Sequence, residues 1–201
     1  MNPARVCTLL LAAGEGRRYG ALKQLERIDG VSLVRRAAQA ALEAGTLLRV
    51  VTGAQAEQVE AGLRDLPLSF VRNAHWREGM GSSLASGARA LLAQDDPPDA
   101  VLIALADQAL VGAAELRLLL DEHARHPRAI IAADHGTVLG PPCVFPAGDL
   151  GELAALQGDR GARALLQVHA ARVRRVIMPQ AAHDVDTADD LARAAAVLRS
   201  R

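Results

Sequence analysis

Strand-like and helix-like patterns alternate along almost the whole chain, and this alternation restricts the fold more than any other feature. Apolar runs typical of buried strands occupy residues 6–11, 47–52, 68–72, 101–106, 129–133 and 173–178. Helical patterns occupy residues 33–44, 54–64, 81–94, 113–126, 150–156, 162–168 and 187–198. Such alternation favours a mostly parallel sheet with helices on both faces. We therefore predict a three-layer α/β fold.

One segment does not fit this pattern cleanly. Residues 137–145 look extended but contain Pro141 and Pro142, whose rings cannot donate a hydrogen bond to a neighbouring strand. We expect this segment to be an edge strand or a loop near a site.

Length, charge and cysteine content narrow the class of protein. With 201 residues, we expect one domain over residues 1–201. The 23 basic residues balance 23 acidic ones, which argues against a nucleic-acid partner because such binding gains from a basic surplus. Cys7 and Cys143 are expected to be buried free thiols. Neither a signal peptide nor an apolar run of roughly 18 residues is found, so we expect a cytoplasmic protein without a membrane partner.

The first apolar run leads into a loop that combines glycines with cations. This loop reads L-A-A-G-E-G-R-R-Y-G over residues 11–20, and Lys23 follows. Small residues let backbone N–H groups approach a phosphate, and the cations neutralise it. The glycine spacing is one residue longer than the dinucleotide fingerprint, and the second strand ends in Thr52-Gly53 without a ribose-binding acid. Lys23 also lacks the flanking residues of a P-loop. The sequence therefore indicates a phosphate-binding loop that is neither a dinucleotide-binding loop nor a P-loop.

Residues that directly follow the other strands are the next candidates, because ligands bind at the carboxyl ends of parallel strands. Asp107 follows six apolar residues, where a carboxylate is costly unless something pairs with it. Mg²⁺ pairs well with one or two carboxylates and substrate phosphates, although capping of the next helix is an equal alternative. Asp189 and Asp190 are expected in the first turn of the last helix, whereas Asp184 and Asp186 precede it and stay open as metal or phosphate-side groups.

Motifs for other chemistry are missing from the sequence. The six histidines contain no H-x-x-x-H pair, and there is no G-x-S-x-G nucleophile motif. His75 lies beside the suspected site but is expected to be an ordinary surface residue. The glycine and serine residues at 79–83 favour a binding role at the start of a helix.

Taken together, these segments resemble the MobA-like nucleotidyltransferases. The loop L-A-A-G at 11–14, with Arg18, Gly20 and Lys23, is similar to the signature loop of that family. Further segments resemble the branch that contains molybdenum cofactor cytidylyltransferase (MocA): E-G-M-G-S-S at 78–83, A-D-Q at 106–108, G-P-P-C-V-F at 140–145, G-D-R-G-A-R at 158–163 and D-V-D-T at 184–187. The resemblance covers residues 9–191 and is specific because six segments recur in order.

The resemblance implies a Rossmann-like fold of the nucleotide-diphospho-sugar transferase type. It also implies transfer of a nucleoside monophosphate from an NTP to a phosphorylated acceptor, with release of pyrophosphate. Arg18, Lys23 and Asp107 would be catalytic, and Asp107 and Asp186 would hold Mg²⁺. The nucleotide would be bound by Leu11, Ala12, Ala13, Gly14, Glu15, Gly16, Arg18, Lys23, Thr52, Gly53, Asn73, Gly81, Ser82 and Ser83.

The resemblance also indicates the substrates. Guanylyl-transferring relatives usually carry glycine where this chain has Ala13, so the loop indicates CTP as the donor. The MocA-like segments indicate molybdopterin as the acceptor and a molybdenum enzyme as a candidate partner. Such a reaction needs positioning and charge neutralisation rather than a His or Cys nucleophile.

Alternatives remain at this stage. Gly16, Tyr19, Ala106 and Ala109 depart from the family pattern without removing a charged group, and changes at Tyr19 and Ala109 could reshape the acceptor pocket. A sugar or isoprenoid phosphate is therefore an alternative acceptor. A second alternative is an oxidoreductase with a nucleotide cofactor, since some MocA-like chains carry that name. A third is a non-catalytic carrier or insertion factor for a molybdenum enzyme.

Overall fold

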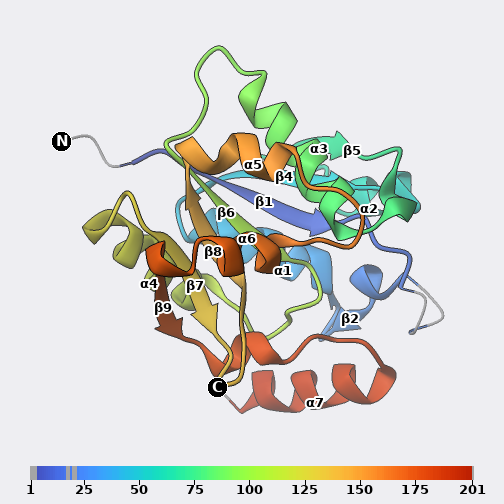
Figure 1. Cartoon of the computed structure of the whole chain (residues 1–201). Helices are drawn as coiled ribbons and strands as arrows, with labels where there is room; N and C mark the ends of the chain where they lie inside the picture. Colours follow the sequence, from blue (N-terminus) through green and yellow to red (C-terminus); the bar gives the residue numbers. More distant parts are fainter. Residues whose placement is uncertain (1–3, 17–18, 20–21, 201) are drawn as a thin grey trace.

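A seven-stranded sheet forms the centre of the computed structural model, which describes residues 4–16, 19 and 22–200 (Figure 1). The strands are β1 (Val6–Ala12), β4 (Leu47–Thr52), β5 (Ser69–Arg72), β6 (Ala100–Leu105), β7 (Ile130–Asp134), β8 (Leu139–Pro146) and β9 (Val173–Ile177). Their order is β5-β4-β1-β6-β8-β7-β9. All adjacent pairs are parallel except those that include β8, which runs antiparallel to both β6 and β7. The predicted mostly parallel α/β fold is confirmed.

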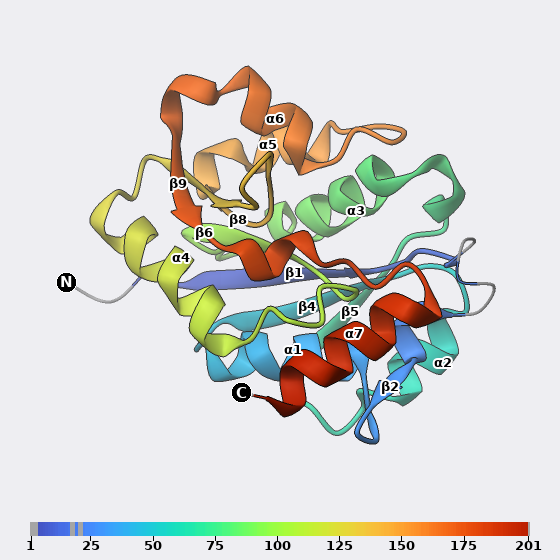
Figure 2. The same ribbon diagram turned by 90° about the horizontal axis from the view of Figure 1, so that it is seen from below.

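Helices cover both faces of this sheet (Figure 2). One face carries α1 (Leu33–Glu43), α2 (Ala56–Ala61) and α4 (Ala113–Arg125), and the other carries α3 (Met80–Leu92), α5 (Leu150–Ala154) and α6 (Ala162–Val168). Successive side chains of β1 point to opposite faces of the sheet. Leu10 packs in the core cluster with Val34, and Leu9 packs in the cluster with Leu84. Three layers follow from this alternation.

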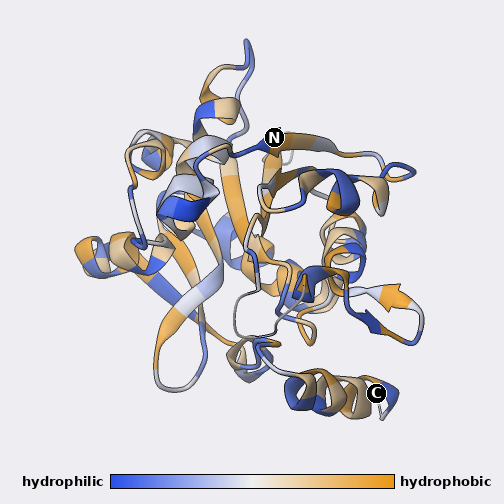
Figure 3. Cartoon of the chain, turned by 90° about the vertical axis from the view of Figure 1, so that its right-hand side faces the viewer, coloured by the Kyte–Doolittle hydropathy of each residue, from blue (hydrophilic) through white to orange (hydrophobic). Residues whose placement is uncertain are grey.

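The core is almost entirely aliphatic, as the low aromatic content of 2% requires. The central strands are mostly orange in Figure 3, and blue segments lie on the surrounding helices and loops. Cys7 and Cys143 are buried free thiols, as predicted. Burial raises the pKa of the Cys7 thiol to about 11, which keeps it protonated. No helix in the described part of the chain is both long and apolar enough to cross a membrane.

The predicted elements agree with the structure to within a few residues, with one omission. A short hairpin of β2 (Arg27–Ile28) and β3 (Val31–Ser32) precedes α1 and was not predicted. Its turn is Asp29-Gly30, and both residues have positive φ, 49° and 82°. Such a pair is a strong hairpin signal, but strands of two residues are too short to show a pattern.

The segment with the two prolines was predicted to be an edge strand or a loop, and this prediction is wrong. β8 lies inside the sheet, between β6 and β7. The pairing with β7 shifts between Ala132 and Ala133, so that Cys143 and Gly140 have partners while Pro141 and Pro142 fall in the interruption. β6 pairs only with residues from Cys143 onward. Bulges are where an internal strand tolerates proline, because no ladder hydrogen bond is required there.

The last helix, α7 (Ala188–Arg199), packs outside the three layers. It forms a separate apolar cluster with the hairpin and with the turn after β6, through Ala194, Ile28 and Leu110. Val185, just before α7, is also buried in this cluster. Packing of Val185 brings the acidic segment 184–186 to the carboxyl end of β6, where the Val185 N–H donates to the Asp107 carbonyl at 2.9 Å.

Candidate active site

A pocket of about 520 Å³ opens at the carboxyl ends of β1 and β6. The chain runs from β1 outward to β4 and β5 and then returns to β6 on the other side of β1, so this is the point at which the strand order reverses. Ligands of open α/β sheets bind at such a point. The lining comes from the glycine loop, the start of α3, the end of β6 and the acidic segment before α7: Leu11, Ala12, Ala13, Gly14, Glu15, Gly16, Tyr19, Lys23, Gln24, Trp76, Arg77, Gly79, Met80, Ser83, Leu105, Ala106, Asp107, Asp159, Asp184 and Asp186.

The glycine loop is held from behind by Gln24, a residue that the sequence analysis did not select. Its buried side-chain amide donates to the carbonyl oxygens of Ala12 and Gly14, at 3.3 and 2.9 Å. Gly16 has a φ of +66°, and its carbonyl accepts from the Tyr19 N–H at 2.9 Å. Gly14 has open space where a side chain would be, so a ligand can approach the backbone there.

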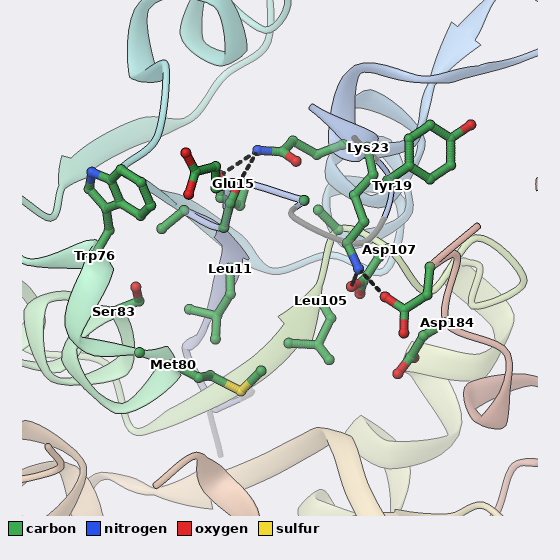
Figure 4. A pocket seen from close by; sticks show the side chains of 18 of the residues that line it. Leu11, Glu15, Tyr19, Lys23, Trp76, Met80, Ser83, Leu105, Asp107 and Asp184 are labelled. Atoms are coloured by element: carbon green, nitrogen blue, oxygen red, sulfur yellow. Dashed lines mark hydrogen bonds and ion pairs between the residues drawn. The ribbon is translucent and has the colours of Figure 1, made fainter. Parts of the chain in front are cut away.

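Lys23 joins the two predicted metal acids at one end of the pocket (Figure 4). Its ammonium nitrogen lies 2.6 Å from Oδ2 of Asp107 and 2.7 Å from Oδ1 of Asp186. Desolvation disfavours the ammonium charge, but the two carboxylates outweigh it and raise the pKa of Lys23. Lys23 is the single lysine among 23 basic residues, the others being arginine. A lone lysine in an arginine-rich chain indicates a position that requires a compact point charge.

The acids around Lys23 suit a divalent cation. Oδ1 of Asp107 is buried and accepts no hydrogen bond from any residue that the structure describes. Nearby Asp184 has a pKa raised to about 6, first by desolvation and then by the charge of Asp107, although the residue is exposed on the surface. Across residues 4–16, 19 and 22–200, no three acidic, histidine or cysteine side chains are arranged to bind a metal alone. Mg²⁺ and similar ions complete such sites with phosphate oxygens.

The opposite end of the pocket combines aromatic and apolar side chains with charged ones, and Glu15 lies there beside Trp76 (Figure 4). Trp76 belongs to a 3₁₀ turn, Trp76–Glu78, and the Arg77 guanidinium lies 4.3 Å from the centre of its ring. Met80, at the start of α3, remains 43% exposed. Leu11 and Leu105 lie between the two ends (Figure 4). One end of the pocket therefore holds Lys23 with its acids, and the other holds the indole and the thioether next to charged side chains.

Five predicted nucleotide-binding residues do not line this pocket, and each has a partner in the protein. Thr52 donates to Glu60, and Gly53 packs against Trp76. The Asn73 side chain donates to the hydroxyls of Ser82 and Ser83 at 2.9 and 3.0 Å. The Ser82 hydroxyl also contacts the carbonyl oxygens of His75 and Gly79. Gly81 donates to the Gly158 carbonyl, and three backbone carbonyls leave no room for a side chain there.

The remaining predicted residues are brought together. Residues 11–16, Lys23, Ser83, Asp107 and Asp186 all line the pocket, although they are distributed over most of the sequence. Arg18 lies outside the described residues. Asp184, left open from the sequence as a metal or phosphate-side group, also lines the pocket, and so do Trp76, Met80 and Asp159, for which no role was predicted. For Met80 and Asp159 the sequence offers no signal apart from nearby glycines.

Comparisons with known proteins find relatives and similar structures over most of the chain. The chain is 34% identical over 172 residues to nicotine blue oxidoreductase of Paenarthrobacter nicotinovorans, covering 81% of each chain. Its fold is shared with a nucleotidyl transferase from Methanothermobacter thermautotroptrophicus, with a TM-score of 0.82 at 24% identity, covering 98% of this chain and 99% of the other. Rv0371c of Mycobacterium tuberculosis H37Rv superimposes with a TM-score of 0.79 at 27% identity, covering 98% and 100%.

Two further findings bear on the chemistry. Rv0371c has also been solved in complex with manganese; that structure matches with a TM-score of 0.74 at 26% identity over 96% of this chain and 98% of the other. A family profile, the MobA-like NTP transferase domain, matches residues 8–175. This match includes the glycine loop, Lys23 and Asp107. The chain belongs to the family of MobA-like NTP transferase domains.

Proposed function

We propose that residues 1–201 form one nucleotidyltransferase domain that transfers CMP from CTP to a phosphorylated acceptor, molybdopterin in the first place, and releases pyrophosphate. The observation that carries this proposal is the contact of Lys23 with both Asp107 and Asp186 at the end of the glycine loop. A cation site beside a phosphate-binding loop is what transfer of a nucleotidyl group requires.

In this reaction an oxygen of the acceptor phosphate attacks the α-phosphorus of CTP, and the bond from that phosphorus to the bridging oxygen of pyrophosphate breaks. The acceptor phosphate is already an anion, so no side chain has to abstract a proton. Residues 11–16 orient the nucleotide through their backbone, and Lys23, with Arg18, neutralises charge on the leaving pyrophosphate. Asp107 and Asp186 would hold Mg²⁺, which supplies Lewis-acid stabilisation of the phosphate oxygens when bound.

The preference for CTP is supported by Ala13. Its side chain is 5% exposed and lies in the glycine loop that lines the pocket. A methyl group at this position would crowd a purine more than a pyrimidine. A panel of CTP, GTP, ATP and UTP, each with molybdopterin, a sugar phosphate and an isoprenoid-precursor phosphate, tests donor and acceptor together. Turnover of another pair in preference to CTP with molybdopterin would contradict the assigned substrates.

The reaction class is tested by replacing the central carboxylate. Asp107→Ala should lower metal-dependent pyrophosphate release by at least about 10²–10³-fold, because the carboxylate that would hold the cation at the reacting phosphates is lost. Asp189→Ala, which removes an equal charge from the exposed first turn of α7, is the matched control and should retain full activity. Near-normal pyrophosphate release by the Asp107 variant would rule out this mechanism.

A second candidate function is an oxidoreductase with a nucleotide cofactor, favoured by the 34% identity to nicotine blue oxidoreductase. Two features argue against a dinucleotide cofactor. The glycine spacing is one residue longer than in the dinucleotide fingerprint, and β4 ends in Thr52-Gly53, where no acid is present to bind a ribose. An absorbance spectrum of the purified protein, followed by titration with NADH and FMN, tests the candidate directly.

A further inference from the structure

The pocket presents two unlike surfaces to whatever binds in it. Lys23, Asp107 and Asp184 lie at one end, and Trp76, Met80 and Ser83 lie at the other, with Leu11 and Leu105 between them (Figure 4). The ionic end suits phosphates and a cation. Phosphates and a cation bound at that end would not contact the indole and the thioether at the other end.

Trp76 is held firmly against the glycine loop. A Cβ atom added to Gly53 would lie 2.6 Å from the Cβ of Trp76 and 2.9 Å from the Cβ of Ala13. Only glycine therefore lets the end of β4, the indole and the loop approach this closely. On the other side of the 3₁₀ turn, the His75 N–H donates to the side chain of Asn73 at 2.9 Å. These contacts fix the place where the Trp76 side chain leaves the backbone.

The exposure of this end is unusual for this chain. Trp76 is the single tryptophan, and aromatic residues make up only 2% of the sequence. The ring is nevertheless half-buried rather than part of the core, and Met80 beside it in the pocket is 43% exposed. Apolar surface left open inside a pocket marks a ligand site. The Arg77 guanidinium lies over the ring, 4.3 Å from its centre, so a flat ligand would stack on the face that Arg77 leaves open.

We propose that Trp76 is the platform on which the planar nitrogen heterocycle of the substrate nucleotide, its base, stacks. This inference rests on the proposed function, because an NTP whose phosphates lie at Lys23 extends its base toward the opposite end of the pocket. Stacking on an indole is available to every base. Trp76 therefore contributes affinity, and the choice between bases falls to other contacts such as Ala13.

The single tryptophan makes the test direct, since all tryptophan fluorescence comes from Trp76. Titration with CTP and Mg²⁺ should quench this fluorescence in a saturable way. Inorganic tripolyphosphate, which offers phosphates without a base, should bind by calorimetry without comparable quenching. Xanthopterin represents the other planar heterocycle of the reaction. Quenching by xanthopterin but not by CTP would overturn the assignment of the base to Trp76.

Variants separate this inference from the proposed function. Trp76→Leu should weaken CTP binding about tenfold, the loss expected for one stacked base, while tripolyphosphate affinity stays within twofold. Trp76→Phe should recover most of the CTP affinity. Leu118→Ala, which changes an apolar side chain that is 53% exposed on α4 and lies away from the pocket, should change neither value. Unaltered CTP affinity in Trp76→Leu would refute the stacking role, whereas absence of NTP binding in the wild type would refute the proposed function itself.

Discussion

Lys23 determines the electrostatics of the site at the scale of single residues. Its ammonium contacts the carboxylates of both Asp107 and Asp186, and the Lys23 and Asp107 side chains are only 18% and 21% exposed. An ion pair in this setting is costly to break from one side, because the remaining charge is left poorly solvated. Lys23 thus acts as an internal counter-ion for the two acids.

Removal of this ammonium should therefore make folding depend on a divalent cation. We expect Lys23→Met to lower the free energy of unfolding by about 1–3 kcal/mol in chelator, somewhat less than for a fully buried pair. Mn²⁺ at about 100 times its dissociation constant should restore about 2.7 kcal/mol. Urea denaturation with and without Mn²⁺ measures both values. Lys23→Arg, which keeps the charge, is the control, and equal sensitivity of both variants to Mn²⁺ would contradict the counter-ion role.

Sequence reasoning found the charged residues of the site but not the residues that position it. Asp107 stands out because it directly follows an apolar strand, whereas Lys23 was selected with the glycine loop and Asp186 as an acid before the last helix. Gln24 and Gly53 do not, because their roles consist of contacts with Gly14 and Trp76 that exist only after folding. Asn73 and Ser82 were expected to bind the nucleotide, and in the structure their side chains bind each other.

At the scale of elements, the start of α7 controls the acidic segment that contains Asp186. The Thr187 hydroxyl caps the helix by accepting from the Asp190 N–H at 3.2 Å, and the Asp190 carboxylate accepts in return from the Thr187 N–H at 2.8 Å. This reciprocal capping fixes the direction in which the chain leaves residue 186.

Loss of the cap should destabilise the protein measurably. Thr187→Ala should lower the free energy of unfolding by about 1 kcal/mol, because the first turn of α7 loses a hydrogen-bond acceptor. Thr187→Ser keeps the hydroxyl and should lose less than half of that. Urea denaturation monitored by circular dichroism compares the two variants with the wild type. An alanine variant as stable as the serine variant would show that the capping hydroxyl does not contribute to stability.

Most strands and helices could be predicted because each has its own periodicity and its own stop signals. Ser32, for example, caps α1, and Gly45 follows the end of that helix with a φ of +87°. The position of β8 could not be predicted in this way. Its two prolines exclude regular pairing locally, and the interruption at Ala132 and Ala133 that accommodates them is a property of the neighbouring strand.

At the scale of the whole molecule, pH should affect stability through a histidine far from the pocket. His123 on α4 is 2% exposed, and burial lowers its pKa although the charge of Asp99 acts weakly in the opposite direction. The folded state therefore holds His123 neutral, while the unfolded chain binds a proton near pH 6.5. The stability that depends on neutral His123 is complete above about pH 6.5 and is lost as the pH falls toward the lowered pKa of the folded state.

This pH dependence can be isolated by substitution. The free energy of unfolding of the wild type should decrease between pH 7.5 and 5.5. In His123→Phe, which fills the site without a titratable group, the decrease should be smaller. Some slope should remain, because burial also lowers the pKa of His135. Urea denaturation at the two pH values measures the difference, and identical slopes for variant and wild type would exclude His123 as a source.

The contact between Lys23 and Asp186 has a consequence for how the protein is made. These residues are 163 positions apart, and Asp107 stands between them in sequence. During synthesis, the strands from β1 to β8 can emerge and pair long before residues 184–186 leave the ribosome. The nascent chain then contains the glycine loop and most of the sheet but lacks the second carboxylate. Completion of the site is thus tied to synthesis of the last segment, so that a chain truncated before residue 184 would carry a partial phosphate cradle without its cation centre.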